Sequence, residues 1–243
     1  MRKPKGRGAV MAQHAPAEVD GDSQVMRHYR RLEFFPTPPW AARAAAEVVL
    51  SLDPGAWDAE DPCCGQGHFA HGLKPYFRTV ATADIYDHGW DGQDRVCDFR
   101  SRDRDMPPPD WYFMNPPFSL AADFIHLGLV RARRGVAVLA RQALMESAGR
   151  YELMFGAGSG FVAYAPYIER VAMTLGRWDP RASTATAYAV FVFMTPEARP
   201  RQAGAHPIVL PIAPGSKARL TRADDARLFG ATTSAPLLER GAA

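Results

Sequence analysis

The sequence predicts one α/β domain with a mostly parallel sheet, and three observations support this prediction. The chain has 243 residues, 47% of them hydrophobic, which is enough to bury one complete core. Short apolar runs alternate with helix-like segments, and turns rich in glycine or proline separate them. This order favours parallel strands covered on both faces, because a helix between two strands returns the chain to the same end of the sheet.

Both ends of the chain are expected to lie outside the domain. Residues 1–24 begin with a basic cluster and continue as a polar stretch with alanine, glycine and proline. Such a segment cannot bury enough apolar surface to offset the entropy of ordering, so we expect a disordered basic tail. Residues 231–243 are expected to form a flexible C-terminal tail. The domain is then expected to span residues 25–230.

The first elements follow from proline placement and apolar spacing. Thr37 before Pro38 and Pro39 predicts an N-cap with proline in the first helical turn, opening an alanine-rich helix over residues 38–52. The next expected elements are a strand at 57–61, a helix ending near Tyr76, and strands at 78–85, 94–99 and 110–114.

The second half of the domain changes character toward its end. The expected elements are a helix at 120–134, a strand at 135–142 and a helix at 143–155. Residues 160–175 and 184–194 are rich in β-formers with no long helix between them, which predicts an antiparallel hairpin closing the edge of the sheet. Residues 206–230 are expected to add a short strand and one helical turn.

Charge and cysteine content set the expected surroundings. The net charge of +3 at pH 7 is weak support for an anionic partner. The chain has 3 cysteines, and the adjacent pair Cys63 and Cys64 fits neither a disulfide framework nor a zinc site. The basic start lacks the apolar run of an export signal, and no run of about 18 apolar residues exists. We therefore expect a soluble cytoplasmic protein with no metal and no membrane contact.

A glycine loop follows the first expected strand. Asp61, Pro62, Gly65 and Gly67 form the pattern DPxxGxG, in which glycine lets the backbone approach a ligand closely. Neither the GxGxxG pattern of pyrophosphate sites nor the GK[ST] ending of phosphate loops is present. A leading aspartate suits a cation better than a phosphate, and S-adenosylmethionine carries an ammonium and a sulfonium. The loop therefore favours that cofactor.

Two later strand ends fit the rest of such a cofactor. Asp84 ends the next strand, where its carboxylate can accept hydrogen bonds from both hydroxyls of a ribose. Asp98 and Phe99 follow the third strand and suit an adenine amino group and ring face. Both aspartates also fit a second interpretation, as solvated caps of strand ends. Cys63 and Cys64 favour packing over nucleophilic chemistry, because neither has a base nearby in the sequence.

The turn of Asn115, Pro116, Pro117 and Phe118 follows a strongly apolar run. An exocyclic adenine amine is a poor nucleophile because its lone pair is delocalised into the ring. Asn115 Oδ1 and the carbonyl of Pro116 can accept its two N–H bonds, and the prolines fix φ so that these acceptors stay aimed. Phe118 offers a stacking face for a base turned out of a helix. The turn therefore suits direct methyl transfer to an amine, with no covalent cysteine intermediate.

Five segments together resemble a known family. FFPTPPW, DPCCGQGHF, the strand end at Asp84, CDF and MNPPF resemble motifs X, I, II, III and IV of S-adenosylmethionine-dependent amino-methyltransferases. Their order is similar to that of N6-adenine DNA methyltransferases of the gamma group and their phage-type relatives, over roughly residues 32–195. The resemblance implies a Rossmann-like methyltransferase fold with a seven-stranded, mostly parallel sheet and an antiparallel hairpin at its edge. It also implies S-adenosylmethionine as cofactor and DNA as partner.

The resemblance also implies a role for each motif residue. Asn115, Pro116, Pro117 and Phe118 are the expected catalytic residues. The expected cofactor-binding residues are Thr37 and Pro38 at the methionine part, Asp61, Cys63, Gly65 and Gly67 around it, Asp84 at the ribose, and Asp98 with Phe99 at the adenine.

Other functions share part of this pattern. Asn-Pro-Pro with an aromatic residue also serves enzymes that methylate an RNA base amine or a protein glutamine amide. The non-enzymatic alternative is a nucleic-acid-binding module with the same fold, although an intact glycine loop and Asn115 argue against it. A C5-cytosine methyltransferase is disfavoured because the Pro62-Cys63 pair lies in the cofactor loop. Little room remains for a separate target-recognition domain, so recognition is expected to use residues 131–134, residues 176–183, the basic tail and the segment after residue 195.

Overall fold

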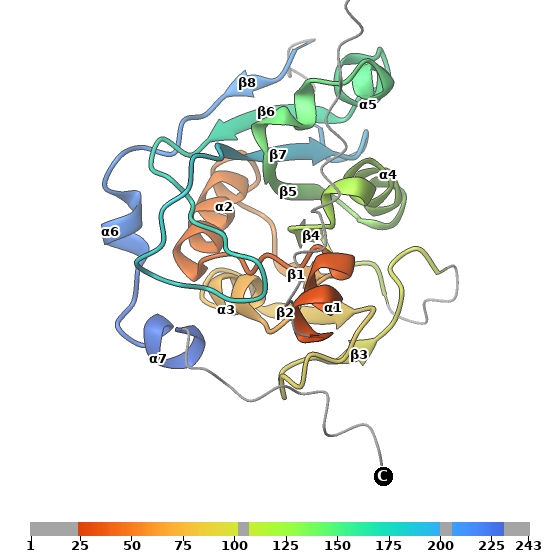
Figure 1. Cartoon of the computed structure of the whole chain (residues 1–243). Helices are drawn as coiled ribbons and strands as arrows, with labels where there is room; N and C mark the ends of the chain where they lie inside the picture. The colour runs from red at the N-terminus through yellow and green to blue at the C-terminus, as the bar shows by residue number, and fades with distance from the viewer. Residues whose placement is uncertain (1–23, 102–106, 200–205, 231–243) are drawn as a thin grey trace, which may run out of the picture.

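The computed structural model describes residues 24–101, 107–199 and 206–230. Its centre is a sheet of eight strands in the order β3-β2-β1-β4-β5-β7-β6-β8 (Figure 1). The predicted fold class, a mostly parallel sheet with helices on both faces, is confirmed. The sheet has one strand more than the seven that the resemblance implies. The added strand, Ile208–Val209 (β8), lies in the segment where a short strand was expected, and it pairs in parallel with Phe161–Pro166 (β6) at the edge.

Five adjacent parallel strands form the larger part of the sheet. They are Asp58–Asp61 (β1), Thr79–Asp84 (β2), Arg95–Val96 (β3), Trp111–Met114 (β4) and Gly135–Arg141 (β5). β1 lies between β2 and β4, with Asp61 opposite Thr82 and Glu60 opposite Tyr112. The carboxyl ends of parallel strands meet at one edge of a sheet. The glycine loop, Asp84 and Asn115 therefore converge there.

The expected antiparallel hairpin is present. Tyr188–Met194 (β7) pairs antiparallel with both β5 and β6, so it lies between them and is buried along its whole length. The connection between β6 and β7, residues 167–187, is long and irregular and runs toward Gln24–Leu32 (α1) (Figure 1). Gly176 in this connection donates its backbone N–H to the carbonyl of Phe34, at 2.8 Å. The connection thereby reaches the end of the sheet where the parallel strands finish.

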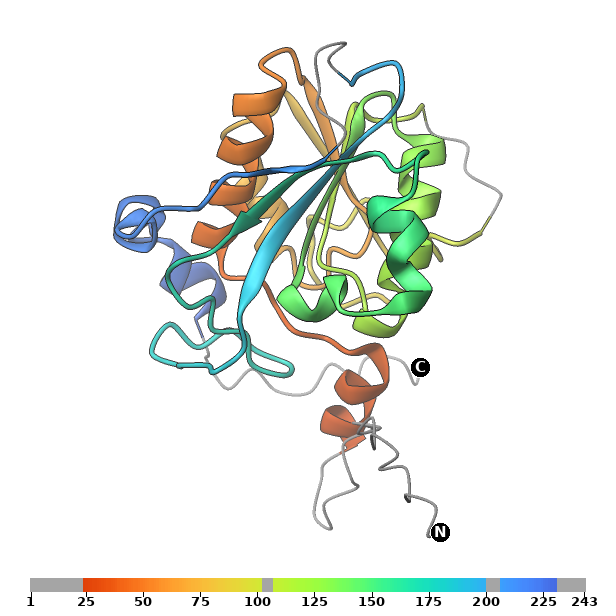
Figure 2. The ribbon, with the colours of Figure 1, turned by 90° about the horizontal axis from the view of Figure 1, so that it is seen from above.

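Helices cover both faces of the sheet (Figure 2). Pro39–Leu52 (α2), His68–Leu73 (α3), Ser216–Leu220 (α6) and Asp225–Phe229 (α7) lie on one face, and Ala121–Arg131 (α4) and Tyr151–Phe155 (α5) on the other. Successive side chains of β4 point to opposite faces. Trp111 and Phe113 enter the core under α2 and α3, and Tyr112 and Met114 enter the core under α4. α1 has no buried residue and lies beyond the carboxyl end of the parallel strands.

A buried ion pair ties the C-terminal segment to α2. Arg43, 1% exposed, donates to the two carboxylate oxygens of Asp225 at 2.6 and 2.7 Å. It also donates to the carbonyl of Leu220, at 2.7 Å. Breaking a buried pair by removing one partner costs about 3–5 kcal/mol. This contact therefore holds α6 and α7 on the domain although each has only 5 residues.

The expected cap of α2 is wrong. Its N-cap residue is Pro38, and no side chain makes a cap hydrogen bond. The Thr37 hydroxyl instead accepts a hydrogen bond from the Asn115 side chain at 3.0 Å. Thr37 is thus committed to a distant turn, and the helix begins on proline alone.

The expected helix at 143–155 is also wrong. The segment is divided into Gln142–Met145, Ala148–Arg150 and α5, of which the first two are short 3-10 turns. Ser147 falls at the break before the second 3-10 turn, and Gly149 lies inside that turn; both residue types disfavour the interior of an α-helix. Arg150 donates to the carbonyl of Leu144 at 2.7 Å, which satisfies a group that a continuous helix would have bonded.

Other boundaries shift by a few residues. α3 ends at Leu73 rather than near Tyr76, and β3 covers only Arg95–Val96. The end of the domain has two short helices, α6 and α7, where one helical turn was expected. The expected tails fall outside the described residues, apart from Gln24, which begins α1. Within the described part of the chain, no helix is both long and apolar enough to cross a membrane.

Candidate functional site

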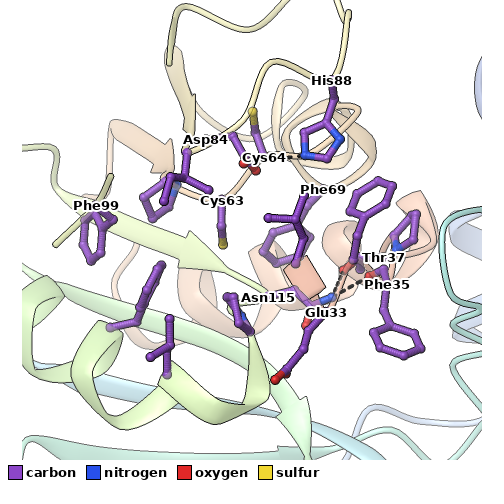
Figure 3. Close-up of a pocket in the computed structure, with 18 of the residues that line it drawn as sticks. Glu33, Phe35, Thr37, Cys63, Cys64, Phe69, Asp84, His88, Phe99 and Asn115 are labelled. Carbon is purple, nitrogen blue, oxygen red and sulfur yellow. Dashed lines mark hydrogen bonds and ion pairs between the residues drawn. The ribbon is translucent and has the colours of Figure 1, made fainter. Parts of the chain in front are cut away.

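A pocket of about 250 Å³ opens at the carboxyl end of the parallel strands (Figure 3). Its wall combines the segment before α2, the glycine loop, the ends of β2 and β4, and residues 98–100. The wall includes seven of the predicted site residues: Thr37, Cys63, Asp84, Asp98, Phe99, Asn115 and Pro117. The other six, which lie next to the wall in the chain rather than in it, are Pro38, Asp61, Gly65, Gly67, Pro116 and Phe118.

Asp61 is fully buried behind the pocket wall. Its Oδ1 accepts the backbone N–H of Cys63 at 3.3 Å, whereas its Oδ2 has no hydrogen-bond partner in the described part of the chain. Burial raises the pKa of Asp61 well above its ordinary value, and the nearby Asp84 carboxylate raises it further. A buried carboxylate oxygen without a donor is unfavourable, so a cationic group beside it would stabilise it.

Asp84 joins the end of β2 to the glycine loop. Its Oδ2 accepts the backbone N–H of Gly65 at 2.9 Å, and its Oδ1 accepts that of Tyr86 at 3.0 Å. His88 Nε2 lies 3.6 Å from Oδ1. A carboxylate has about four acceptor sites, so these two backbone bonds leave capacity for ligand hydroxyls. Asp84 therefore both shapes the loop and presents acceptors in the pocket wall.

Neighbouring aromatic rings leave no room for a side chain at either glycine of the loop. Both have positive φ, 51° at Gly65 and 82° at Gly67. A Cβ on Gly65 would lie 2.4 Å from the ring of Phe34, and one on Gly67 would lie 2.3 Å from the indole of Trp90. Phe34 in turn stacks on His88, with ring centroids 4.6 Å apart. The sequence predicts that a ligand approaches the backbone at these glycines. In the structure, the side chains of Phe34 and Trp90 make that close approach instead.

The two cysteines of the loop are poor nucleophiles. Burial raises the pKa of Cys63 well above its ordinary value, and the Asp61 and Asp84 charges add to the effect. Burial raises the pKa of Cys64 in the same way. A thiol reacts as its thiolate. Both residues therefore act as small packed side chains, the interpretation that the sequence favours.

Asp98 and Phe99 lie at the far end of the pocket. A side-chain hydrogen bond from Arg100 lowers the pKa of Asp98, and the two residues also form an ion pair at 3.0 Å. Phe99 is 2% exposed and packs against Phe124 with ring centroids 5.0 Å apart. The Arg131 guanidinium lies 5.1 Å from the centroid of the same ring. Both residues reach the pocket wall, and their contact with an adenine stays a prediction.

The Asn115 side chain is held by its nitrogen. Nδ2 donates to the carbonyl of Phe35 at 2.8 Å and to the Thr37 hydroxyl at 3.0 Å, and it lies 3.5 Å from Met173 Sδ (Figure 3). A carbonyl oxygen only accepts, so the Phe35 contact fixes which end of the amide faces it. Asn115 Oδ1 is therefore turned away from these partners. This is the orientation that an acceptor for a substrate amine requires.

Phe118 has neighbours that the sequence does not indicate. Its backbone N–H donates to Glu33 Oε2 at 2.6 Å, and the N–H of Ser119 lies 3.4 Å from the same oxygen. Its ring lies 5.6 Å from that of Phe35, and the Arg141 guanidinium lies 4.1 Å from its centroid. The first amide protons after the two prolines are thus occupied by a carboxylate, and the ring is covered by a cation.

Sequence reasoning missed several residues of the site. Glu33 precedes the FFPTPPW segment directly, so the acidic residue beside that motif was the available signal. Met173 lies in a β-rich run and carries no signal in the sequence. His68 also lines the pocket, and burial lowers its pKa to about 3, so its ring is neutral at pH 7.

One cluster in the described residues could hold a metal ion, and it lies outside the pocket. It consists of His71, Asp224 and Asp225. Both carboxylate oxygens of Asp225 are already bonded to Arg43. The cluster is therefore part of the anchor of α7 to α2.

Comparison with known proteins identifies the fold. No protein-family model matches the chain, and no curated protein matches its sequence. A Pyrococcus horikoshii protein, named for a proposed RNA methyltransferase activity, superimposes with a TM-score of 0.52 at 15% identity, over 72% of this chain and 90% of that one. A methyltransferase subunit of a type I restriction-modification system from Streptococcus thermophilus gives 0.49 at 14% identity, over 67% of this chain and 45% of that one. This chain thus spans about half the length of that subunit. The fold is the Rossmann-like fold of methyltransferases.

Proposed function

We propose that this protein transfers a methyl group from S-adenosylmethionine to the exocyclic amino nitrogen of adenine in DNA. The orientation of the Asn115 amide is the observation that supports this most directly. With Nδ2 bonded to Phe35 and Thr37, Oδ1 remains for a substrate N–H in a turn whose two prolines carry no amide proton. Asn115 lines the same pocket as Asp84, at the ends of β4 and β2, the two strands that flank β1.

The buried carboxylates fit the proposed cofactor. Asp61 Oδ2 lacks a donor in the described part of the chain, and an ammonium or sulfonium supplies the positive charge that this oxygen favours. Asp84 has acceptor capacity for ribose hydroxyls. Asp98 and Phe99 are proposed to contact the adenine, and Thr37, Pro38, Cys63, Gly65 and Gly67 to enclose the remainder. When bound, S-adenosylmethionine supplies an electrophilic methyl group.

The residues of the turn have separate roles in the proposed reaction. Asn115 Oδ1 and the Pro116 carbonyl accept the two N–H bonds of the amine, which favours a tetrahedral nitrogen with its lone pair free. Pro116 and Pro117 keep the acceptors in place, so little reorganisation is needed during transfer. Phe118 supplies the stacking surface for the target base. The protein thus acts mainly through orientation.

A nucleoside assay tests this function. DNA and RNA are incubated with the protein and S-adenosylmethionine carrying a labelled methyl group, digested to nucleosides and analysed by mass spectrometry. Labelled N6-methyladenine in DNA, formed more slowly by roughly 10²-fold or more with Asn115→Ala, is the expected result. Label only in RNA, or in neither nucleic acid, would refute the proposal. RNA is the main competing substrate, because the structurally similar Pyrococcus horikoshii protein is named for RNA methylation. The lone pair of an RNA base amine is also delocalised into the ring, so the same turn could accept it.

A further inference from the structure

The segment 33–37, here called the strap, is bonded to the turn 115–119 at three points. Glu33 Oε2 accepts the Phe118 N–H at 2.6 Å. The carbonyl of Phe35 and the hydroxyl of Thr37 accept from Asn115 Nδ2 at 2.8 and 3.0 Å (Figure 3). The strap therefore contacts both ends of the turn, at the side chain that faces the amine and at the backbone that follows the prolines.

The amide of Asn115 has two ends of nearly equal shape, so hydrogen bonds decide which end faces the pocket. The Phe35 carbonyl can only accept, and it excludes Oδ1 from the strap side. The Thr37 hydroxyl adds the second acceptor, on a residue that is 3% exposed. Thr37 therefore helps to hold Oδ1 in the orientation that suits an amine donor.

Glu33 has an unusual backbone conformation. It is the only non-glycine residue with positive φ in the described part of the chain, at 50°. The N–H groups of Glu33 and Phe34 bond the carbonyls of Arg30 and Tyr29 at 3.1 and 2.9 Å, which is the pattern of a Schellman cap at the end of α1. Glycine is the usual residue at this position because it has no Cβ. The glutamate carboxylate, however, reaches the turn, which glycine cannot do.

We propose that Thr37 and Glu33 are positioning residues for methyl transfer. Thr37 fixes the Asn115 amide with Oδ1 toward the target amine, and Glu33 holds the backbone of the turn through the Phe118 N–H. This inference rests on the proposed function. It assigns the Thr37 hydroxyl to Asn115, whereas the rest of the side chain stays in the pocket wall around the cofactor, and valine keeps that shape. It also accounts for a glutamate at a position where glycine is sterically preferred.

Thr37→Val and Thr37→Ser form a matched pair, since valine keeps the shape and serine keeps the hydroxyl. Single-turnover methyl transfer at saturating cofactor and DNA is expected to slow roughly three- to tenfold in Thr37→Val, the range for one lost hydrogen bond. Thr37→Ser is expected to stay near the wild-type rate, and calorimetry is expected to give an unchanged cofactor affinity. A wild-type rate in Thr37→Val overturns the inference. Weaker cofactor binding with an unchanged rate at saturation also overturns it.

Glu33→Gly and Glu33→Gln separate backbone strain from the carboxylate contact. Glycine relieves the positive φ, so Glu33→Gly is expected to unfold at an equal or higher temperature and yet to transfer methyl groups more slowly. The amide oxygen of glutamine can accept the Phe118 N–H as the glutamate carboxylate does. The transfer rate of Glu33→Gln is therefore expected to stay within about twofold of wild type. A wild-type rate in Glu33→Gly refutes the role of Glu33.

Amide NMR distinguishes failure of this inference from failure of the proposed function. The Asn115 side-chain NH₂ resonances are identified by their loss in Asn115→Ala. They are expected to exchange with water faster in Thr37→Val than in wild type or Thr37→Ser. Unchanged exchange overturns the positioning role whatever the substrate is. Faster exchange in a protein that methylates no DNA supports the positioning contact and refutes the DNA activity alone.

Discussion

The guanidinium of Arg141 lies 4.1 Å from the centroid of the Phe118 ring. Arg141 is the last residue of β5, and Phe118 follows the two prolines after β4, so neighbouring parallel strands bring the pair together. A cation over an aromatic face at a surface site contributes about 0.5–1 kcal/mol. A flat base that stacks on the same face has to displace the guanidinium.

Arg141→Ala is therefore expected to ease capture of the target base. Removing a competitor worth about 0.5–1 kcal/mol should raise the extrahelical population about two- to fivefold. Fluorescence of 2-aminopurine at the target position measures that population. The gain should vanish in a Phe118→Ala background, which serves as the control. Equal fluorescence for Arg141→Ala and wild type would show that the base does not use this face.

Asn115 and Phe118 are expected to differ in the step that each supports. Asn115→Ala should lower the single-turnover rate by roughly 10²-fold or more, the scale of a preorganised transition-state contact, while cofactor binding persists. Phe118→Ala should cost about 1–3 kcal/mol, chiefly as weaker capture of the target base. Rates at saturating DNA, with cofactor affinity measured in parallel, separate the two effects. Wild-type transfer by Asn115→Ala would exclude this turn as the reaction centre.

Asp84→Ala is expected to weaken S-adenosylmethionine binding by about 1.5–3 kcal/mol, the scale of a hydrogen bond to a charged group. Asp84 also accepts the Gly65 N–H, so the variant should lower the melting temperature as well. Asp84→Asn keeps one acceptor oxygen and serves as the matched control. Calorimetry gives the dissociation constants. An unchanged constant in Asp84→Ala would remove Asp84 from the cofactor site.

Asp61 should make the stability of the cofactor-free protein depend on pH. Burial raises its pKa well above the ordinary value, so Asp61 favours the folded state at low pH and opposes it once the pH rises through the raised pKa. Asp61→Asn is then expected to melt higher than wild type above that pKa. The gain should disappear below about pH 4, the ordinary pKa of aspartate. A gain that is the same at every pH would contradict the assignment.

The same carboxyl group should couple cofactor binding to proton release. A cation near Asp61 favours its ionised form, so binding should tighten as the pH rises through the raised pKa. Titrations in two buffers with different ionisation enthalpies measure the protons released. Asp61→Asn is the control and should release none from this position.

The convergence of Asn115, Asp84 and the glycine loop could be predicted because each lies at the end of a predicted strand of a parallel sheet. Such strand ends meet at one edge whatever the intervening sequence. The helix expected at 143–155 failed for the opposite reason. The apolar residues of this segment have helical spacing, but Ser147 and Gly149 both disfavour the interior of an α-helix. The Arg150 side chain donates to the Leu144 carbonyl, which a continuous helix would have bonded.

The contacts around Asn115 could not be predicted from the sequence. Phe35 and Met173 lie 80 and 58 residues away from it in the chain. Neither segment carries a pattern that specifies which side of the amide it will face. The cap role expected for Thr37 came from a valid local rule, and a part-buried hydrogen bond from a residue 78 positions away overrode it.

The crowding of Gly65 by Phe34 and of Gly67 by Trp90 makes these four positions two epistatic pairs. Alanine at Gly67 would meet the indole and would also adopt a φ of 82°, so trimming Trp90 relieves only the first of two penalties. The backbone penalty that remains is of order 1–3 kcal/mol. Engineering this loop for an altered cofactor therefore has to vary Phe34 and Trp90 together with it, because a library confined to residues 61–67 would return glycine at both positions.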